Sequence, residues 1–148
     1  MMRAYASRVL PHDPALVWSM VRVFDRLCDW HPAVIDGAIE DGRAADQVGC
    51  VRAFHLTDGS LVRERLLSLD DRARQLTYEF VTPAFPVDNY VAGIRVASIS
   101  ADGGSFVEWW ADFDEPCGRD GKHGALISKA IFADGLAALA QRLAGTAR

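Results

Sequence analysis

The chain has 148 residues, of which 50% are hydrophobic and 24% charged, and its formal net charge is -4. This length fits one domain, spanning residues 1–148, that can bury a substantial core. The basic residues are scattered among acidic ones, so the sequence lacks the basic patch of a nucleic-acid-binding protein and a polybasic membrane-binding face.

The first elements are a strand and a helix. Apolar and polar residues alternate over residues 4–10, which predicts a strand. Asp13 and Pro14 then form a helix start, because Asp13 accepts from free backbone N–H groups and proline suits the first helical position. We expect this helix to run to about Phe24, with a further short turn over residues 27–30.

A run of strands follows, separated by turn signals. Asp58-Gly59 and Asp102-Gly103 favour tight hairpins, because both residue types tolerate positive φ. The strands on either side of these turns are therefore expected to pair antiparallel. The predicted strands cover residues 50–56, 61–69, 76–81, 89–99 and 106–113.

Three charged residues, Arg52, Glu64 and Glu108, lie inside strands that otherwise look half buried. A strict two-residue turn at Asp58-Gly59 would place Arg52 opposite Arg65, which is an unfavourable like-charge pair. A turn longer by an odd residue brings Arg52 and Glu64 onto one face, and this is the arrangement we predict. The two side chains then either share a ligand or form a salt bridge that only neutralises buried charge.

The last strand is ambiguous. Its alternation places one set of residues on each face, and apolarity favours burial of the first set. The first set is Val107, Trp109, Ala111 and Phe113, and the second is Glu108, Trp110 and Asp112.

The C-terminal segment predicts a helix over roughly residues 122–144, with Ile127, Ile131, Gly135 and Leu139 in one row facing the sheet. Gly135 is unusual there, since a mid-helix glycine costs about 1 kcal/mol relative to alanine. Either the helix packs very closely at this point or a cavity needs the space.

The cysteines and the absence of a signal-peptide core indicate the cellular compartment. Cys28, Cys50 and Cys117 are widely spaced and form no CxxC motif, which favours reduced thiols. Met1 to Leu10 has no signal-peptide core, and we expect no later segment to reach the apolar length that crosses a bilayer. A cytoplasmic protein is therefore expected. The histidines lack metal-ligand spacing, so neither a metal site nor a cofactor is predicted.

The ordered residues also carry a resemblance. The chain is similar to the START-like or Bet v 1-like (SRPBCC) superfamily, and within it to the polyketide cyclase/dehydrase branch with its MxaD-like members. Some positions resemble those of plant abscisic acid receptors. The matching segments are Trp30-His31-Pro32, Gly49-Cys50-Val51-Arg52, Asp58-Gly59, Glu64-Arg65-Leu66, Asp70-Asp71, Asn89-Tyr90 and Val107-Glu108-Trp109.

The resemblance implies an α+β helix-grip fold. About seven antiparallel strands curve around a long C-terminal helix, two short helices follow the first strand, and a cavity lies between sheet and helix. By matching position, Glu64 and Tyr90 point inward, and similarity to the hormone receptors also places Glu108 and Trp110 inside. The candidate ligand-binding residues are Arg52, Glu64, Tyr90, Ala92, Ile94, Glu108, Trp110, Trp30, Ile127, Ile131 and Gly135.

Several roles stay open within this set. Tyr90 lines the cavity or is a core residue whose hydroxyl bonds the backbone. Trp30 and His31 close the cavity mouth, with His31 as a general base the alternative.

Two functional classes compete. The first is binding of a small hydrophobic or amphipathic, polyketide-like molecule; the second is a cofactor-independent cyclase or dehydratase that uses the same cavity for positioning and acid/base catalysis. The standard catalytic motifs GxSxG, GxGxxG and HExxH are absent from the sequence. A largely filled core in a protein that acts through its surface is a third reading. No nucleic-acid partner or membrane insertion is expected, and a homodimer is compatible with the fold type.

Overall fold

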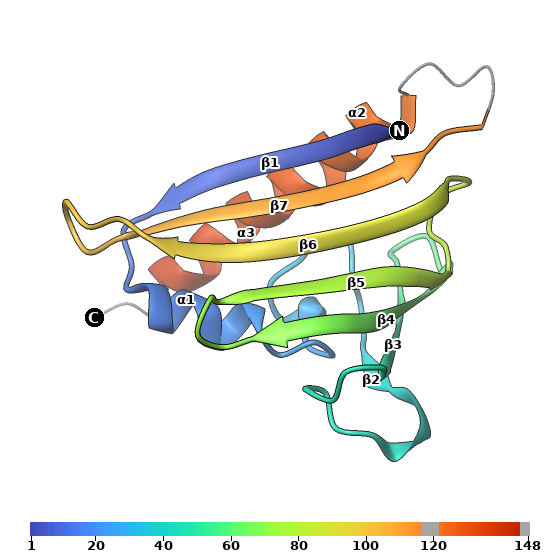
Figure 1. Ribbon diagram of the computed structural model, residues 1–148, viewed down its shortest axis with the longest axis horizontal. Coiled ribbons are helices and arrows are strands. Elements are labelled where there is room, and N and C mark those ends of the chain that lie inside the picture. The colour runs from blue at the N-terminus through green and yellow to red at the C-terminus, as the bar shows by residue number, and fades with distance from the viewer. Residues whose placement is uncertain (117–121, 146–148) are drawn as a thin grey trace.

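The computed structural model describes residues 1–116 and 122–145. Seven strands form one antiparallel sheet in the order β1-β7-β6-β5-β4-β3-β2. The sheet curves around the C-terminal helix, which crosses its concave side (Figure 1). The strands are β1 (Met2–Leu10), β2 (Ala38–Ile39), β3 (Val51–His55), β4 (Leu61–Asp70), β5 (Gln75–Thr82), β6 (Asp88–Ser98) and β7 (Ser105–Asp114).

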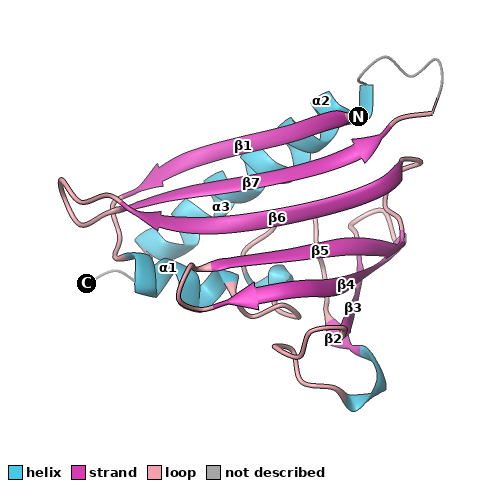
Figure 2. Cartoon of the chain, in the orientation of Figure 1, coloured by secondary structure: helices cyan, strands magenta, loops and turns pink. Residues whose placement is uncertain are grey.

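The helical segments confirm the expected helix-grip arrangement, with the short helices between β1 and β3 (Figure 2). The C-terminal helix has a π-helical middle part, η3, between two α-helical ends. The segments are α1 (Pro14–Val21), η1 (Leu27–Asp29), η2 (Glu40–Gly42), α2 (Lys122–Leu126), η3 (Ile127–Ala133) and α3 (Asp134–Ala144).

Helix α1 begins as predicted but ends earlier. The Asp13 carboxylate accepts from the backbone N–H of Ala15 at 2.7 Å, and Pro14 occupies the first turn. The helix stops at Val21 rather than near Phe24. Phe24 is nevertheless fully buried, because the loop after α1 turns into the interior of the sheet and carries its ring to the candidate site described below.

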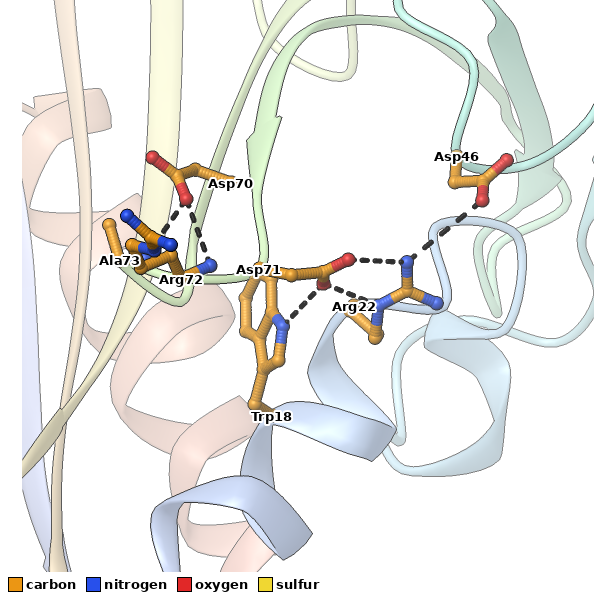
Figure 3. Close-up of polar contacts among 7 residues, drawn as sticks. All are labelled: Trp18, Arg22, Asp46, Asp70, Asp71, Arg72 and Ala73. Carbon is orange, nitrogen blue, oxygen red and sulfur yellow. Dashed lines mark hydrogen bonds and ion pairs between the residues drawn. The ribbon is translucent and has the colours of Figure 1, made fainter.

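Helix α1 is fastened to the β4–β5 hairpin by Asp71, which follows β4 (Figure 3). One Asp71 oxygen accepts from the indole N–H of Trp18 and from Nε of Arg22, both at 2.8 Å. Arg22 also lies 4.0 Å from the carboxylate of Asp46. These contacts hold α1 across one end of the curved sheet, where the indole of Trp18 is buried.

The hairpin between β3 and β4 has the predicted odd length. Leu56 and Ser60 close the turn through a 2.9 Å backbone hydrogen bond, which leaves three residues between them. Gly59 adopts a φ of +88°, a conformation that glycine takes at low cost. The resulting register pairs Arg52 with Glu64, as the charge argument predicted.

The C-terminal helix corrects one expectation. Residues Lys122–Ala144 form a 23-residue helix that contains an 18-residue window with a mean hydropathy of 1.2, so by length and composition alone it is apolar enough to cross a bilayer. Its residues Ile127, Phe132, Leu136 and Leu139 are buried within the domain. We therefore interpret it as the core helix that the sheet encloses.

The cysteines of the described residues are free thiols. Cys50 is buried and Cys28 partly exposed. Cys117 lies outside the described residues.

Candidate functional site

Arg52 and Glu64 form a buried ion pair on the concave face of the sheet. The guanidinium contacts the Glu64 carboxylate through Nε at 2.8 Å and Nη2 at 2.7 Å. Its third nitrogen, Nη1, donates to the backbone carbonyl of Phe24 at 2.9 Å. Each side chain is less than 10% exposed. All three guanidinium nitrogens are therefore engaged within the protein.

The Glu64 carboxylate is less completely satisfied. Both contacts with Arg52 use the same oxygen, Oε1, and no donor to Oε2 is found among residues 1–116 and 122–145. Burial raises the pKa of Glu64, although the Arg52 charge and its hydrogen bond act in the opposite direction. Arg52 thus fixes the orientation of the Glu64 carboxylate, and the second oxygen, Oε2, is available to accept a hydrogen bond from another group.

Aromatic rings surround the ion pair. The Arg52 guanidinium lies 4.0 Å from the ring centre of Phe24 and 4.7 Å from that of Tyr78, distances typical of cation–π contacts. The Tyr78 hydroxyl accepts from the indole N–H of Trp109 at 2.9 Å. Burial raises the pKa of Tyr78 and of Tyr90, so both phenols stay protonated at neutral pH.

These side chains line a cavity of about 40 Å³ between the sheet, the loops and the C-terminal helix. Such a volume holds about three water molecules, whereas sites for small organic ligands are about 300–1,000 Å³. The cavity is therefore too small for such a ligand without a movement of its lining side chains. It is lined by Leu27, His31, Ala33, Val34, Arg52, Phe54, Leu56, Val62, Glu64, Tyr78, Phe80, Ala84, Phe85, Tyr90, Trp109 and Ile131.

His31 connects the cavity wall to the π-helical segment η3. Its Nε2 lies 2.7 Å from the carbonyl oxygen of Ile131, and its Nδ1 accepts from the backbone N–H of Ala33 at 3.1 Å. These partners assign the proton of the neutral ring to Nε2. Burial lowers the pKa of His31, and the nearby charge of Arg52 lowers it further. His31 is thus a neutral, fully bonded side chain.

The structure decides between close packing and an adjacent cavity as the reason for Gly135. A Cβ atom at this position would lie 2.6 Å from Cδ2 of His31 and 2.9 Å from Cζ3 of Trp109. Both distances are far below van der Waals contact. The glycine therefore allows close packing of α3 against two rings and does not leave an empty space.

The structure brings together only part of the predicted ligand-binding set. Four of its members line the cavity, namely Arg52, Glu64, Tyr90 and Ile131. Five more are buried around it without lining it, namely Trp30, Ala92, Ile94, Ile127 and Gly135. The predicted inward face of β6 is confirmed, since Tyr90, Ala92, Ile94 and Val96 are all buried.

Glu108 and Trp110 are corrections, because they face away from the cavity. In β7 every second residue is buried, and the buried set contains Val107, Trp109 and Ala111. The Trp110 indole covers Gly93 on the outer face of the sheet. Apolarity thus indicated the correct face of the last strand, whereas similarity to the hormone receptors did not.

Sequence reasoning missed Tyr78, Phe24 and the loop residue Phe85. Tyr78 had a usable signal, because the alternation of Leu76, Tyr78 and Phe80 along β5 places all three on one face. Phe24 and Phe85 lie outside strands and helices, where no periodicity indicates a direction.

Metal chemistry finds no support in the described part of the chain. No group of three or more His, Cys, Asp or Glu side chains is placed there to hold a metal ion. Two histidines outside the cavity instead lie beside a carboxylate, His55 at 2.9 Å from Asp36 and His123 at 3.8 Å from Glu115.

A curved antiparallel sheet that wraps a long helix, with a polar pair in a small cavity between them, defines a helix-grip protein. Residues 1–144 match the sequence profile of the family described as "Polyketide cyclase / dehydrase and lipid transport". The chain therefore belongs to this family, within the START-like, Bet v 1-like superfamily. A comparison with curated proteins gives no match.

Solved structures agree with this assignment. XoxI from Bacillus cereus is 28% identical with a TM-score of 0.87, over 100% of this chain and 99% of its own. A protein from Thermobifida fusca is 30% identical with a TM-score of 0.87, over 100% and 97%. Norcoclaurine synthase from Thalictrum, solved with a transition-state analogue, is 13% identical with a TM-score of 0.75, over 98% and 96%, and shares the fold.

Proposed function

We propose that this protein binds a small hydrophobic or amphipathic molecule between the sheet and the C-terminal helix, with the ligand's polar group at Glu64. The observation that carries the proposal is the second carboxylate oxygen of Glu64, which has no donor among the described residues although the side chain is buried beside Arg52. Glu64 lines the cavity, so a ligand N–H or O–H group can donate a hydrogen bond to this oxygen.

The ion pair also specifies the chemistry of the ligand. Each nitrogen of Arg52 already contacts Glu64 or the carbonyl of Phe24, and the adjacent charge of Glu64 disfavours a ligand carboxylate. The free oxygen belongs to Glu64 and accepts hydrogen bonds when ionised. A ligand with an N–H or O–H group on an aromatic or aliphatic body fits this site, and an organic acid does not.

The remaining predicted residues act as the apolar wall in this proposal. Tyr90 and Ile131 would contact the ligand, and Trp30, Ala92, Ile94, Ile127 and Gly135 would support the side chains that do. Such a mostly apolar lining with few polar groups is typical of small-molecule sites. We place the protein in the cytoplasm, where its free cysteines would stay reduced.

Catalysis in the same cavity is the second candidate function. The raised pKa of Glu64 favours it, because burial makes the carboxyl group hold a proton more tightly than an exposed carboxyl group does, as a general acid requires. Tyr78 and Tyr90 would supply protonated hydroxyl groups beside it. A cyclase or dehydratase of this kind loses turnover in Glu64→Gln while it still retains substrate.

Native mass spectrometry of the protein purified from cells that naturally produce it tests the binding proposal. We expect a retained small molecule, lost or reduced at least tenfold in Glu64→Gln. The matched control is Glu108→Gln, the same change on the opposite face of the sheet, which should retain the molecule. Equal retention by both variants removes Glu64 from the site. A protein that carries and takes up no small molecule favours the reading of a filled core that acts through its surface.

A further inference from the structure

The sheet opens between β5 and β6. These strands pair from Gln75 opposite Arg95 to Glu79 opposite Val91, and the ladder stops there. Beyond Glu79, β5 continues to Thr82 and stays paired with β4, its neighbour on the other side. Figure 1 shows β5 and β6 diverging towards the loop that joins them. Backbone pairing between β5 and β6 thus covers only part of their lengths.

Two stacked aromatic rings fill this opening. Phe80 from β5 and Tyr90 from β6 have ring centres 3.9 Å apart and an interplanar angle of 14°. Both residues line the inner cavity. Both also line a groove of about 410 Å³ on the other side, together with Glu79, Pro83, Val87, Asp88, Asn89 and Val91. The stacked rings of Phe80 and Tyr90 therefore form a partition between the inner cavity and the groove.

Phe80 is also the cross-strand neighbour of Glu64 on β4. Paired residues of adjacent strands point to the same face, so the side chains of Phe80 and Glu64 lie next to each other on the cavity side of the sheet. Backbone pairing with β4 fixes the main chain at Phe80, whereas its half-buried ring is held by packing alone.

We propose that the Phe80 ring is a movable partition, and that a ligand reaches Glu64 from the groove by passing between β5 and β6. This inference rests on the proposed function, since it assigns the access route and the outer compartment of the same site. The inner cavity of about 40 Å³ is too small for an organic ligand, and the groove of about 410 Å³ supplies the missing space. The two compartments together fit an elongated molecule.

The groove also indicates the chemistry of the outer end. Its rim carries Glu79, Asp88 and Asn89, whereas Pro83, Val87 and Val91 supply apolar surface. An elongated amphipathic molecule matches this order, with one hydrogen-bond donor at Glu64, an apolar middle part at the partition and a polar end at the rim.

A competing route runs through the loops. Ala33, Leu56 and Phe85 line the inner cavity but not the groove. If ligands pass there, Phe85 is the ring that obstructs them. Phe80 and Phe85 therefore allow the same substitution to be compared at the two routes.

Stopped-flow fluorescence with N-phenyl-1-naphthylamine, a neutral hydrophobic probe with one N–H group, measures the association rate constant. We expect Phe80→Ala to raise this constant at least tenfold and Phe80→Leu to raise it less. Phe85→Ala should have a smaller effect than Phe80→Ala. Phe106→Ala, a control on the outer face of β7, should match the wild type. Circular dichroism before each experiment confirms that the variants are folded.

The outcomes separate the access route from the function. A wild-type rate in both folded Phe80 variants, or a larger increase in Phe85→Ala, overturns the partition while saturable 1:1 binding still supports the site. Failure of the probe to bind the wild type and every variant overturns both. Acceleration by Phe80→Ala that Phe85→Ala and Phe106→Ala do not share supports both.

Discussion

Arg52 and Glu64 lie directly opposite one another on β3 and β4 because three residues close the hairpin between them. With two or four residues in that turn, Arg65 would face Arg52 and Glu64 would be displaced by one position. The hairpin length thus determines both the neutralisation of a buried charge and the position of the one carboxylate in the cavity.

The buried pair should contribute far more to stability than the exposed pair beside it. Arg52→Met leaves Glu64 buried without its cation, which typically costs about 3–5 kcal/mol of unfolding free energy. The control is Arg65→Met, which breaks the more exposed Arg65–Glu79 pair between β4 and β5 and should cost about 0–1 kcal/mol. Urea unfolding at pH 7 measures both changes, and equal losses would contradict the assignment.

His31 should make the protein less stable as the pH falls from 7 to 5. Its folded-state pKa lies below the ordinary value of 6.5, so the unfolded chain binds a proton that the folded protein does not. The unfolding free energy then decreases as pH falls through the unfolded value towards the folded one, by at most about 1.4 kcal/mol per unit. Protonation would also place an N–H on Nδ1 against the N–H of Ala33.

Urea titrations at several pH values test this dependence. His31→Gln should flatten the slope between pH 7 and 5, whereas His55→Gln removes an exposed imidazole and serves as the control. A slope that survives in His31→Gln would assign the pH dependence to another group.

Two helix glycines should respond oppositely to alanine. Gly135→Ala places a Cβ against His31 and Trp109, and such overpacking typically costs about 1–3 kcal/mol. At Gly124 the nearest atom to a new Cβ is Cζ of Phe113 at 3.7 Å, an ordinary contact. Gly124→Ala should therefore stabilise the protein by up to about 1 kcal/mol through helix propensity. Thermal unfolding of both variants checks the opposite signs.

Asp71 should matter to the attachment of α1, and Asp46 should not. Asp71→Ala leaves the buried indole N–H of Trp18 without its acceptor, a loss typically worth about 1–3 kcal/mol. Asp46 only approaches Arg22 at 4.0 Å, and its side chain is exposed. Asp46→Ala should therefore unfold like the wild type. Equal destabilisation by both substitutions would show that Arg22, rather than Trp18, is the important partner.

Local patterns explain why much of the fold was predictable. The Asp-Gly turns, the alternation of the strands and the Asp13-Pro14 helix start each act over a few residues, and like-charge repulsion excluded one hairpin length. The two-residue strand β2 carries too little pattern to be located. The end of α1 was misplaced because burial of Phe24 resembles the continuation of an apolar helix face.

The candidate site was predictable only in its strand residues. Arg52, Glu64 and Tyr90 follow from alternation and charge, and the apolar alternation of β7 correctly selected Trp109 over Trp110. The hydrogen bond from His31 to Ile131 depends on a carbonyl in a π-helical turn, which the four-residue spacing of the helix does not reveal. The small volume of the cavity depends on the packing of aromatic rings from several segments that lie far apart in the sequence.

A crystal structure of the protein with N-phenyl-1-naphthylamine tests the central claim most directly. We predict the probe between the sheet and the C-terminal helix, its N–H within hydrogen-bonding distance of Glu64 Oε2, and the Phe80 ring displaced from Tyr90. A probe bound only on the outer face of the sheet, with the Phe80 ring still stacked on Tyr90, would contradict this prediction.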